Sequence, residues 1–211
     1  MNNFFKQTSN QEISLRYLIV CIFAIPVFIS VLFLIGMGIQ GVITGSWTFS
    51  LNPKAGLIIN YIENALFILL YFKILFSKNF TITKKAKAGL IILTIVVILS
   101  VLDKIFSSVI NELIDNGHTE GDYTAITFYS LYQAFKFVLY IVGLWIFISG
   151  CKVEKALKRF VIATPFISSV AISIRMILMN SNISIFLTSY ILPVIILVVV
   201  YHLSGINKQN L

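Results

Sequence analysis

Apolar residues occur along this chain in six long stretches, and short polar segments separate them. The stretches cover residues 17–40, 55–76, 88–108, 123–149, 160–178 and 183–203. A helix that crosses the apolar core of a bilayer needs about 20 predominantly apolar residues, and each stretch is close to that length. The pattern therefore predicts an all-α integral membrane protein with six transmembrane helices in a single bundle.

Basic residues are distributed unevenly between the segments that connect these stretches. One side of the predicted membrane receives eleven Lys and Arg residues, and the other receives only Lys54. The eleven are Lys6, Arg16, Lys78, Lys84, Lys85, Lys87, Lys152, Lys155, Lys158, Arg159 and Lys208. Because Lys and Arg are enriched in cytoplasmic loops, both termini are predicted to be cytoplasmic. The domains are then a cytoplasmic segment at 1–16, the transmembrane domain at 17–204 and a cytoplasmic tail at 205–211.

Composition excludes several classes of protein. With 58% hydrophobic and 11% charged residues among 211, the chain has too few charges for an ordinary soluble domain. Six helices leave only short connections, so no separate soluble domain is expected. The net charge of +8 comes from the predicted cytoplasmic loops, where it would attract anionic lipid headgroups. The expected partners are membrane lipids, and nucleic acid is not among them.

Three of the six stretches carry a seam of polar side chains. Residues three or four positions apart share one face of a helix, and the polar positions of these stretches follow that spacing. The candidate ligand-binding residues are Asn60, Glu63 and Asn64 in the second stretch, Tyr132, Gln133 and Lys136 in the fourth, and Ser168 and Arg175 in the fifth. Since the other faces are apolar, we expect a polar intramembrane cavity between helices 2, 4 and 5. In it, Tyr132 and Tyr140 would hold a ligand with their rings while Lys136 fixes an anionic group.

Charged side chains within the stretches predict two ion pairs. A charge near the bilayer centre is costly and usually faces a partner inside the bundle. Counting along the stretches puts Glu63 and Lys136 near the midplane and Asp103 level with Arg175. We therefore expect a Glu63–Lys136 pair and an Asp103–Arg175 pair. Two roles remain open for the first pair, which either fixes the packing of the helices or lies in a cavity that takes a solute or an ion.

Motifs of the common enzyme classes are missing from the sequence. It contains no H-E-x-x-H zinc motif, no G-x-S-x-G nucleophile elbow and no G-x-x-x-x-G-K-[ST] phosphate loop. The letters G-M-G-I-Q-G at 36–41 match a dinucleotide fingerprint, but they end an apolar stretch and follow no strand. Close helix packing is the expected role of these glycines. The sequence predicts neither a cofactor nor a bound metal, and it favours a protein without catalytic activity.

Two functions are consistent with this pattern. The first is a transporter, or the membrane subunit of one, whose cavity binds a small molecule or an ion. It rests on the polar seams and on Pro26, Pro165 and Pro193, because proline frees a backbone carbonyl that a neighbour or water must satisfy. The second is a non-transporting sensor, immunity or assembly protein with a protein partner in the membrane, whose buried charges are structural. Thirteen Lys against three Arg, with frequent Ile and Asn, suggest an AT-rich bacterial genome and hence an inner membrane.

Overall fold

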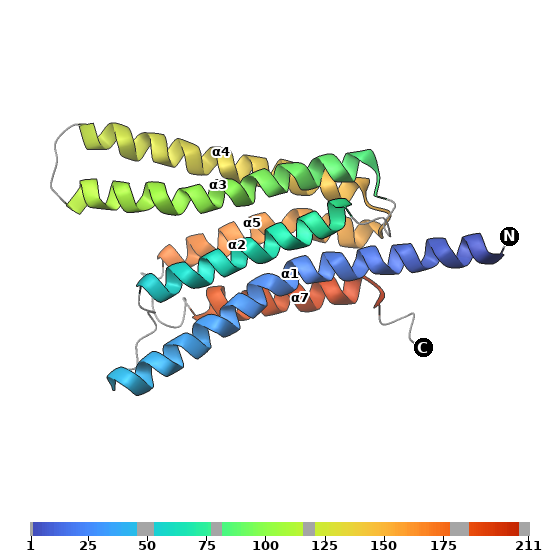
Figure 1. Ribbon diagram of the computed structural model, residues 1–211, viewed down its shortest axis with the longest axis horizontal. Helices are drawn as coiled ribbons and strands as arrows, with labels where there is room; N and C mark the ends of the chain where they lie inside the picture. Colours follow the sequence, from blue (N-terminus) through green and yellow to red (C-terminus); the bar gives the residue numbers. More distant parts are fainter. Residues whose placement is uncertain (1, 46–52, 77–81, 116–120, 178–185, 207–211) are drawn as a thin grey trace.

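The computed structural model describes residues 2–45, 53–76, 82–115, 121–177 and 186–206, and every regular element in these segments is helical. The elements are α1 (Asn2–Thr44), α2 (Pro53–Phe76), α3 (Lys84–Asp115), α4 (Gly121–Gly150), α5 (Lys155–Ile177), the π-helical turn η1 (Leu187–Ile191) and α7 (Leu192–Leu203). Consecutive helices run in alternating directions, so the start of α1 and the end of α7 lie at the same end of the molecule (Figure 1). The predicted all-α class is confirmed.

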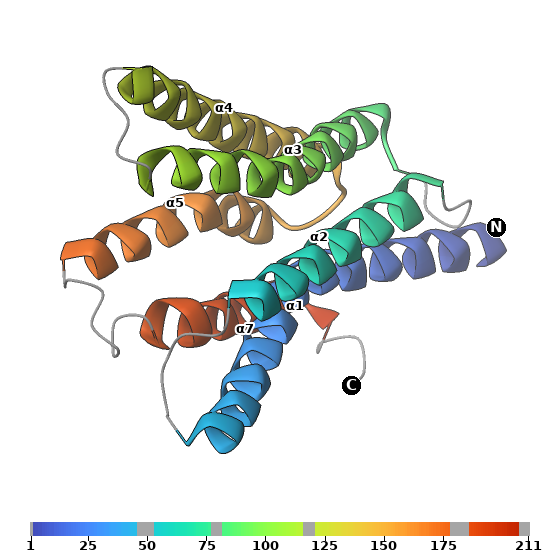
Figure 2. The ribbon, with the colours of Figure 1, turned by 60° about the vertical axis from the view of Figure 1, so that its left-hand side comes forward.

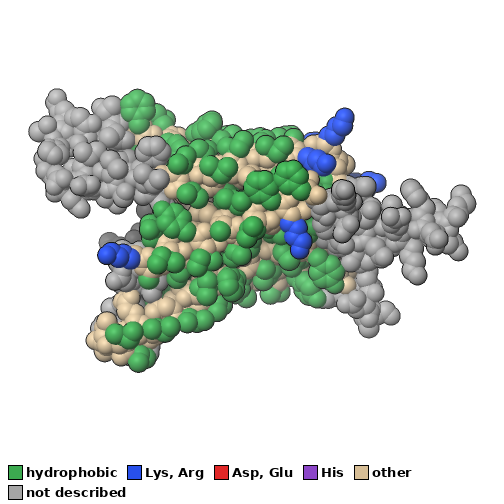
Figure 3. Space-filling model, viewed as in Figure 1, with side chains coloured by type: hydrophobic (Ala, Val, Ile, Leu, Met, Phe, Trp, Pro, Cys, Tyr) green, Lys and Arg blue, Asp and Glu red, His purple; other side chains and the backbone are tan. Residues whose placement is uncertain are grey.

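Among the described residues, five helices are long and apolar enough to cross a membrane. Their apolar segments are Leu15–Thr44, Lys54–Phe76, Lys84–Asp103, Thr127–Gly150 and Lys155–Arg175. Leu187–Leu203 is a shorter apolar helix, and residues 183–185 of the sixth predicted stretch lie outside the described part of the chain. Hydrophobic side chains spread over the outside of the helices (Figure 3), where Ile43 is 76% and Leu69 is 67% exposed. An apolar exterior of this kind is expected of helices surrounded by hydrocarbon.

The N-terminal segment belongs to the first helix. From residue 2 onward, the predicted cytoplasmic segment 1–16 is the beginning of α1, which continues without a break to Thr44. This helix bends part-way along its length (Figure 2), and Pro26 lies inside it. Proline lacks an N–H group and its ring clashes with the carbonyl of the preceding turn, so it is the usual cause of such a bend. Residues 207–211 of the predicted tail lie outside the described residues.

Helices α3 and α4 form the most extensive helix pair. Glycine residues allow the backbones of these two helices to lie close together. A Cβ atom at Gly89 would lie 2.2 Å from the backbone nitrogen of Phe147, and one at Gly150 would lie 2.5 Å from that of Ala86. Small residues allow backbones to approach this closely. Thr83 joins the same ends, since its hydroxyl donates to the Gly150 carbonyl at 2.8 Å and accepts from the Ala86 N–H at 3.1 Å. These contacts fix the register of α4 on α3.

Close packing does not account for Gly38, contrary to the prediction. A Cβ atom added there would meet nothing within 4 Å. The reason is visible in Figure 2, where the second half of α1 diverges from the neighbouring helices beyond the bend. The G-M-G-I-Q-G letters lie inside this continuous helix, so the strand that a dinucleotide site requires does not precede them.

The hydrophobic core lies toward the end of the molecule at which α1 begins. It takes residues from the first half of α1, the end of α2, the start of α3, the end of α4, the start of α5 and the end of α7. Its fully buried members include Ile19, Ile74, Leu90, Phe147, Leu157 and Val200. Apolar side chains therefore close this half of the structure, and polar side chains between the helices concentrate beyond it.

Candidate functional site

A cavity of about 650 Å³ lies among the helices, next to the hydrophobic core. Its polar lining consists of Asn60, Glu63, Asn64 and Tyr71 from α2, Ser100 and Asp103 from α3, Gln133, Lys136 and Tyr140 from α4, Thr164, Ser168 and Ser169 from α5, and Thr188 from η1. Helices α1 and α7 complete the wall with apolar residues and proline. The volume falls within the range of roughly 300–1,000 Å³ that small-molecule pockets occupy.

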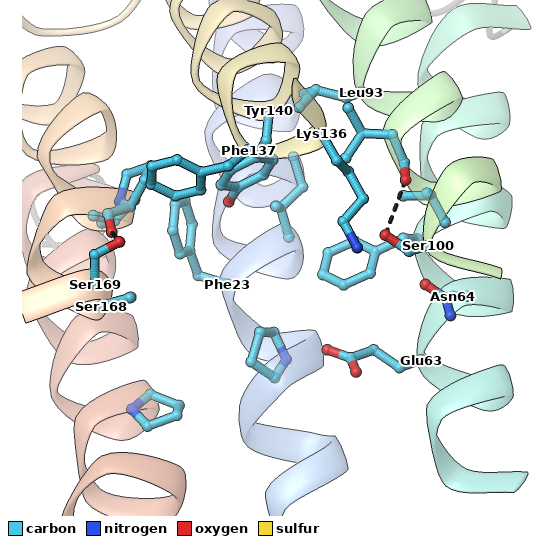
Figure 4. Close-up of a pocket in the computed structure, with 18 of the residues that line it drawn as sticks. Phe23, Glu63, Asn64, Leu93, Ser100, Lys136, Phe137, Tyr140, Ser168 and Ser169 are labelled. Carbon is cyan, nitrogen blue, oxygen red and sulfur yellow. Dashed lines mark hydrogen bonds between the residues drawn. The ribbon is translucent and has the colours of Figure 1, made fainter. Parts of the chain in front are cut away.

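Six of the eight predicted ligand-binding residues line this cavity. They are Asn60, Glu63, Asn64, Gln133, Lys136 and Ser168. Figure 4 shows Glu63 and Asn64 on one side of the cavity and Ser168 on the other. The seams on α2, α4 and α5 thus meet around one space, as their helical spacing indicated. The wall extends beyond the three predicted helices, because α1, α3 and the η1–α7 segment also contribute to it.

Tyr132 and Arg175 are not part of the cavity wall. The Tyr132 hydroxyl donates to the backbone carbonyl of Leu99 at 2.6 Å, which directs this side chain against α3. Arg175 lies in the last turn of α5, where the partial negative charge of the helix end favours a cation. Both residues therefore contribute to helix packing or to helix ends, and neither borders the space that a ligand could fill.

The central ion pair joins Lys136 to Asp103. The Lys136 ammonium lies 2.8 Å from Asp103 Oδ2, and the two side chains are only 16% and 15% exposed. Gln133 donates an amide N–H to the other carboxylate oxygen. The predicted partners are consequently wrong: Lys136 pairs with Asp103 and not with Glu63, and the Asp103 carboxylate is bound by α4 and not by Arg175.

The register of α3 on α4 explains this pairing. Gly89 touches Phe147; fourteen residues further along α3 is Asp103, and fourteen residues back along α4 is Gln133. Because the two helices are antiparallel, the same number of residues counted forward on α3 and backward on α4 from one contact leads to two positions at the same height. Gln133 and Asp103 therefore meet. Side chains on a helix lean toward its N-terminus, which brings the Lys136 ammonium back by one turn to the same carboxylate. Asp103 was not predicted to line the cavity, because the level at which it meets α4 follows from the contact at Gly89, which the sequence does not show.

Three prolines within the helices line the same cavity. They are Pro26 of α1, Pro165 of α5 and Pro193 of α7. Proline lacks the N–H that would bond the carbonyl four residues earlier, and hydroxyl groups replace it at two of the three sites. The Val161 carbonyl freed by Pro165 accepts from the Thr164 hydroxyl at 2.7 Å. The Ser189 carbonyl freed by Pro193 accepts from the Ser30 hydroxyl of α1 at 2.8 Å. Helix irregularity is thus concentrated around the cavity, where the π-helical turn η1 also lies.

The chemistry available in the cavity is that of binding. Within the described segments of the chain, no three His, Cys, Asp or Glu side chains come together to hold a metal ion. The two carboxylates of the lining are Glu63 and Asp103, and the second is bound by Lys136. Amide and hydroxyl groups supply the remaining polar surface, and they can donate to or accept from a bound solute.

Comparison of the chain with protein-family models, with curated proteins and with solved structures finds no match in any of the three. The function is therefore inferred from the cavity and its surroundings.

Proposed function

We propose that this chain is a six-span integral membrane protein of a bacterial inner membrane, and that it binds a small polar solute in the central cavity. It acts as a transporter or as the membrane subunit of one. The observation that carries the proposal is a cavity of about 650 Å³ on which polar side chains from α2, α3, α4 and α5 converge. Polar groups that only hold helices together need no volume between them, whereas a ligand site needs convergent polar groups around usable space.

The arrangement of charges supports an orientation with both termini in the cytoplasm. In the view of Figure 3, Lys and Arg side chains are more frequent toward the end at which α1 begins than at the opposite end, and apolar side chains cover the surface between the two ends. In intact cells, an impermeant thiol reagent should label Lys54→Cys and leave Lys84→Cys unlabelled, each in a background that lacks Cys21. The reverse pattern would invert the orientation.

The position of the hydrophobic core supports a cavity that is closed toward the cytoplasm and faces the other side of the membrane in this structure. Apolar side chains pack between the cavity and the end where α1 begins, and we assign that end to the cytoplasm. A transporter must open the cavity to the other side at some stage of its cycle. Pro26, Pro165 and Pro193 supply bend points at the level of the cavity, where such a movement needs them.

The test is two-sided labelling of Asn64→Cys in proteoliposomes. Asn64 lines the cavity, and Leu69 on the same helix, 67% exposed on the outside, provides the matched control variant Leu69→Cys. A transporter predicts that impermeant reagents label position 64 from the outside and, more slowly, from the inside, while position 69 stays unlabelled from both. Labelling of position 64 from neither side would contradict the proposal.

One observation favours the alternative, a non-transporting sensor, immunity or assembly protein. The Asp103 carboxylate is bound by both Lys136 and Gln133, as a purely structural charge would be. If the protein does not transport, an impermeant reagent should label Asn64→Cys from one side of the membrane only. Reagent added to the other side should give no further labelling.

A further inference from the structure

The charged side chains of the cavity lining are engaged with other groups of the protein. They are Glu63, Asp103 and Lys136. The Lys136 ammonium lies 2.8 Å from Asp103 Oδ2, and Gln133 donates an N–H to the other oxygen of this carboxylate. Glu63 also interacts with another group of the chain. A charged ligand would therefore have to compete with an existing partner at each of these side chains.

A second set of polar side chains in the lining is available to a ligand. These side chains make no hydrogen bond to any other group in the described segments of the chain. They are Asn60, Asn64 and Tyr71 of α2, Tyr140 of α4 and Ser168 of α5. Amide and hydroxyl groups can both donate and accept hydrogen bonds, and Asn64 and Ser168 lie on opposite sides of the cavity (Figure 4). The polar groups that a ligand can reach without competition are therefore uncharged.

The Tyr71 hydroxyl is the most deeply buried group of this second set. Tyr71 is only 3% exposed, and its ring contacts that of Phe67, with the ring centroids 5.9 Å apart. A buried hydroxyl that lacks a hydrogen bond is unfavourable, and most buried polar groups in proteins have a partner. Because Tyr71 borders the cavity, a solute bound there can supply that partner.

Aromatic rings lie among these polar groups. Phe67 follows Asn64 by three residues and precedes Tyr71 by four, so the three side chains share one face of α2. Figure 4 shows Phe23, Phe137 and Tyr140 grouped on another part of the wall. Aromatic side chains offer a large apolar contact surface. The lining thus suits a molecule that has hydroxyl groups along its edge and C–H groups on its faces.

We infer that the cavity binds a small uncharged polyhydroxy solute, a polyol or a monosaccharide. Its hydroxyl groups form hydrogen bonds with Asn64, Tyr71 and Ser168, and its C–H surface packs on Phe67. The cavity of about 650 Å³ has room for such a molecule, since one water molecule occupies about 30 Å³ in the liquid. The inference rests on the proposed function, because it assigns a class of solute to the same cavity.

The experiment compares three probes that share one sugar ring: glucose, glucuronate and glucosamine. Their binding to the full chain in lipid nanodiscs is measured by calorimetry at about pH 6, where the acid is ionised and the amine is protonated. A charged probe must give up its hydration without gaining an unengaged opposite charge. We therefore expect glucose to bind at least about tenfold more tightly than either charged probe.

Substitutions that remove single polar groups locate the bound probe. Tyr71→Phe deletes one hydroxyl and should weaken glucose binding about three- to tenfold, the effect of one lost hydrogen bond. Asn64→Leu deletes a whole amide and should weaken it about tenfold or more. The matched control is Tyr61→Phe, since Tyr61 lies on the same helix, is 38% exposed and does not line the cavity. This control should leave glucose binding unchanged.

Tyr71→Phe and Asn64→Leu break no hydrogen bond of the protein, so both variants should fold, and circular dichroism with thermal unfolding checks this. Glucose binding less than tenfold tighter than that of either charged probe overturns the inference, as does unchanged glucose affinity in both folded variants. In those cases loss of the bound probe in Ser168→Trp, which fills the cavity, would leave the proposed function standing. Failure of all three probes to bind also overturns the inference, and two-sided labelling of Asn64→Cys then decides the proposed function separately.

Discussion

The Lys136 ammonium lies 2.8 Å from an Asp103 carboxylate oxygen, so one ion pair joins α4 to α3 at the border of the cavity. Removal of one partner leaves a buried charge without compensation, which costs about 3–5 kcal/mol in protein interiors. We therefore expect Asp103→Asn and Lys136→Met each to lower the free energy of unfolding by several kcal/mol. The double variant should lose less than the sum of the two, as measured by unfolding of the purified protein.

The control for this cycle is the combination of Lys136→Met with Glu63→Gln. Asp103, and not Glu63, is the carboxylate that lies 2.8 Å from the Lys136 ammonium, so these two losses should be closer to additive than the losses at positions 103 and 136. The observed pairing would be contradicted if the double variant at positions 63 and 136 lost less stability than the sum of its single variants while the losses at positions 103 and 136 were additive.

Alanine substitutions at Gly89 of α3 and at Gly38 of α1 should differ in their effect on stability. A methyl group at Gly89 would come within 2.2 Å of the Phe147 backbone nitrogen, so Gly89→Ala must push α3 and α4 apart. Overpacking of this kind costs about 1–3 kcal/mol or more. Gly38→Ala meets nothing within 4 Å and should be neutral, or stabilising by up to about 1 kcal/mol because alanine is the better helix former. Equal thermal stability of the two variants would show that α3 and α4 do not approach as described.

The Ser30 hydroxyl should stabilise the contact between α1 and the η1–α7 segment. It donates at 2.8 Å to the Ser189 carbonyl, which Pro193 leaves without its usual N–H donor. Hydrogen bonds between membrane helices contribute roughly 0.6–2 kcal/mol, and Ser30→Ala should lose about that amount. In a Pro193→Ala background, which restores the N–H, the same substitution should cost less. An equal loss of stability in both backgrounds would show that the contribution of the Ser30 hydroxyl does not depend on the N–H that Pro193 lacks.

Cys151 should be unreactive in the folded protein. It follows α4 directly and is 3% exposed; burial, opposed in part by the Lys158 charge, raises the pKa of its thiol to about 12. Only the thiolate reacts with iodoacetamide, so alkylation between pH 7 and 9 should require unfolding. The folded state retains a proton that the unfolded chain releases above a pKa of about 8.5. The stability contributed by this group is therefore complete below that pH and is lost as the pH rises toward 12.

The control for this measurement is Lys152→Cys in a background that lacks Cys21. Position 152 is exposed and should react readily in the folded protein. Alkylation of native Cys151 at the same rate as this neighbour would refute its burial.

Helix positions were largely predictable from the sequence. A long apolar segment in hydrocarbon must satisfy its backbone hydrogen bonds internally, so an apolar run of sufficient length indicates a helix. The predicted stretch 55–76 corresponds to α2 (Pro53–Phe76), and the stretch 123–149 corresponds to α4 (Gly121–Gly150). The helix face on which each polar seam lies was also predictable, since helical spacing fixes which residues lie on the same face.

Partners across helices were not predictable from depth alone. Depth was counted from the ends of the apolar stretches, but α3 continues to Asp115, and a lysine side chain can reach across a full helical turn. Tyr132 shares the face of Lys136 by spacing, yet its hydroxyl bonds to α3 because that helix lies so close. The close approach depends on Gly89 and Gly150, and their effect on register appears only once the two helices are placed together.

An open, hydrated cavity among the helices is the feature on which both proposals depend. Its water content can be measured with a nitroxide label at Ser168→Cys, through the electron spin echo modulation that deuterated water produces. The matched control is a label at Phe166→Cys, which lies on the same helix and is 52% exposed on the outside. We predict a strong deuterium signal at position 168 and a weak one at position 166. A signal at 168 as weak as that at 166 would contradict the cavity, and would mean that the polar seams only hold the helices together.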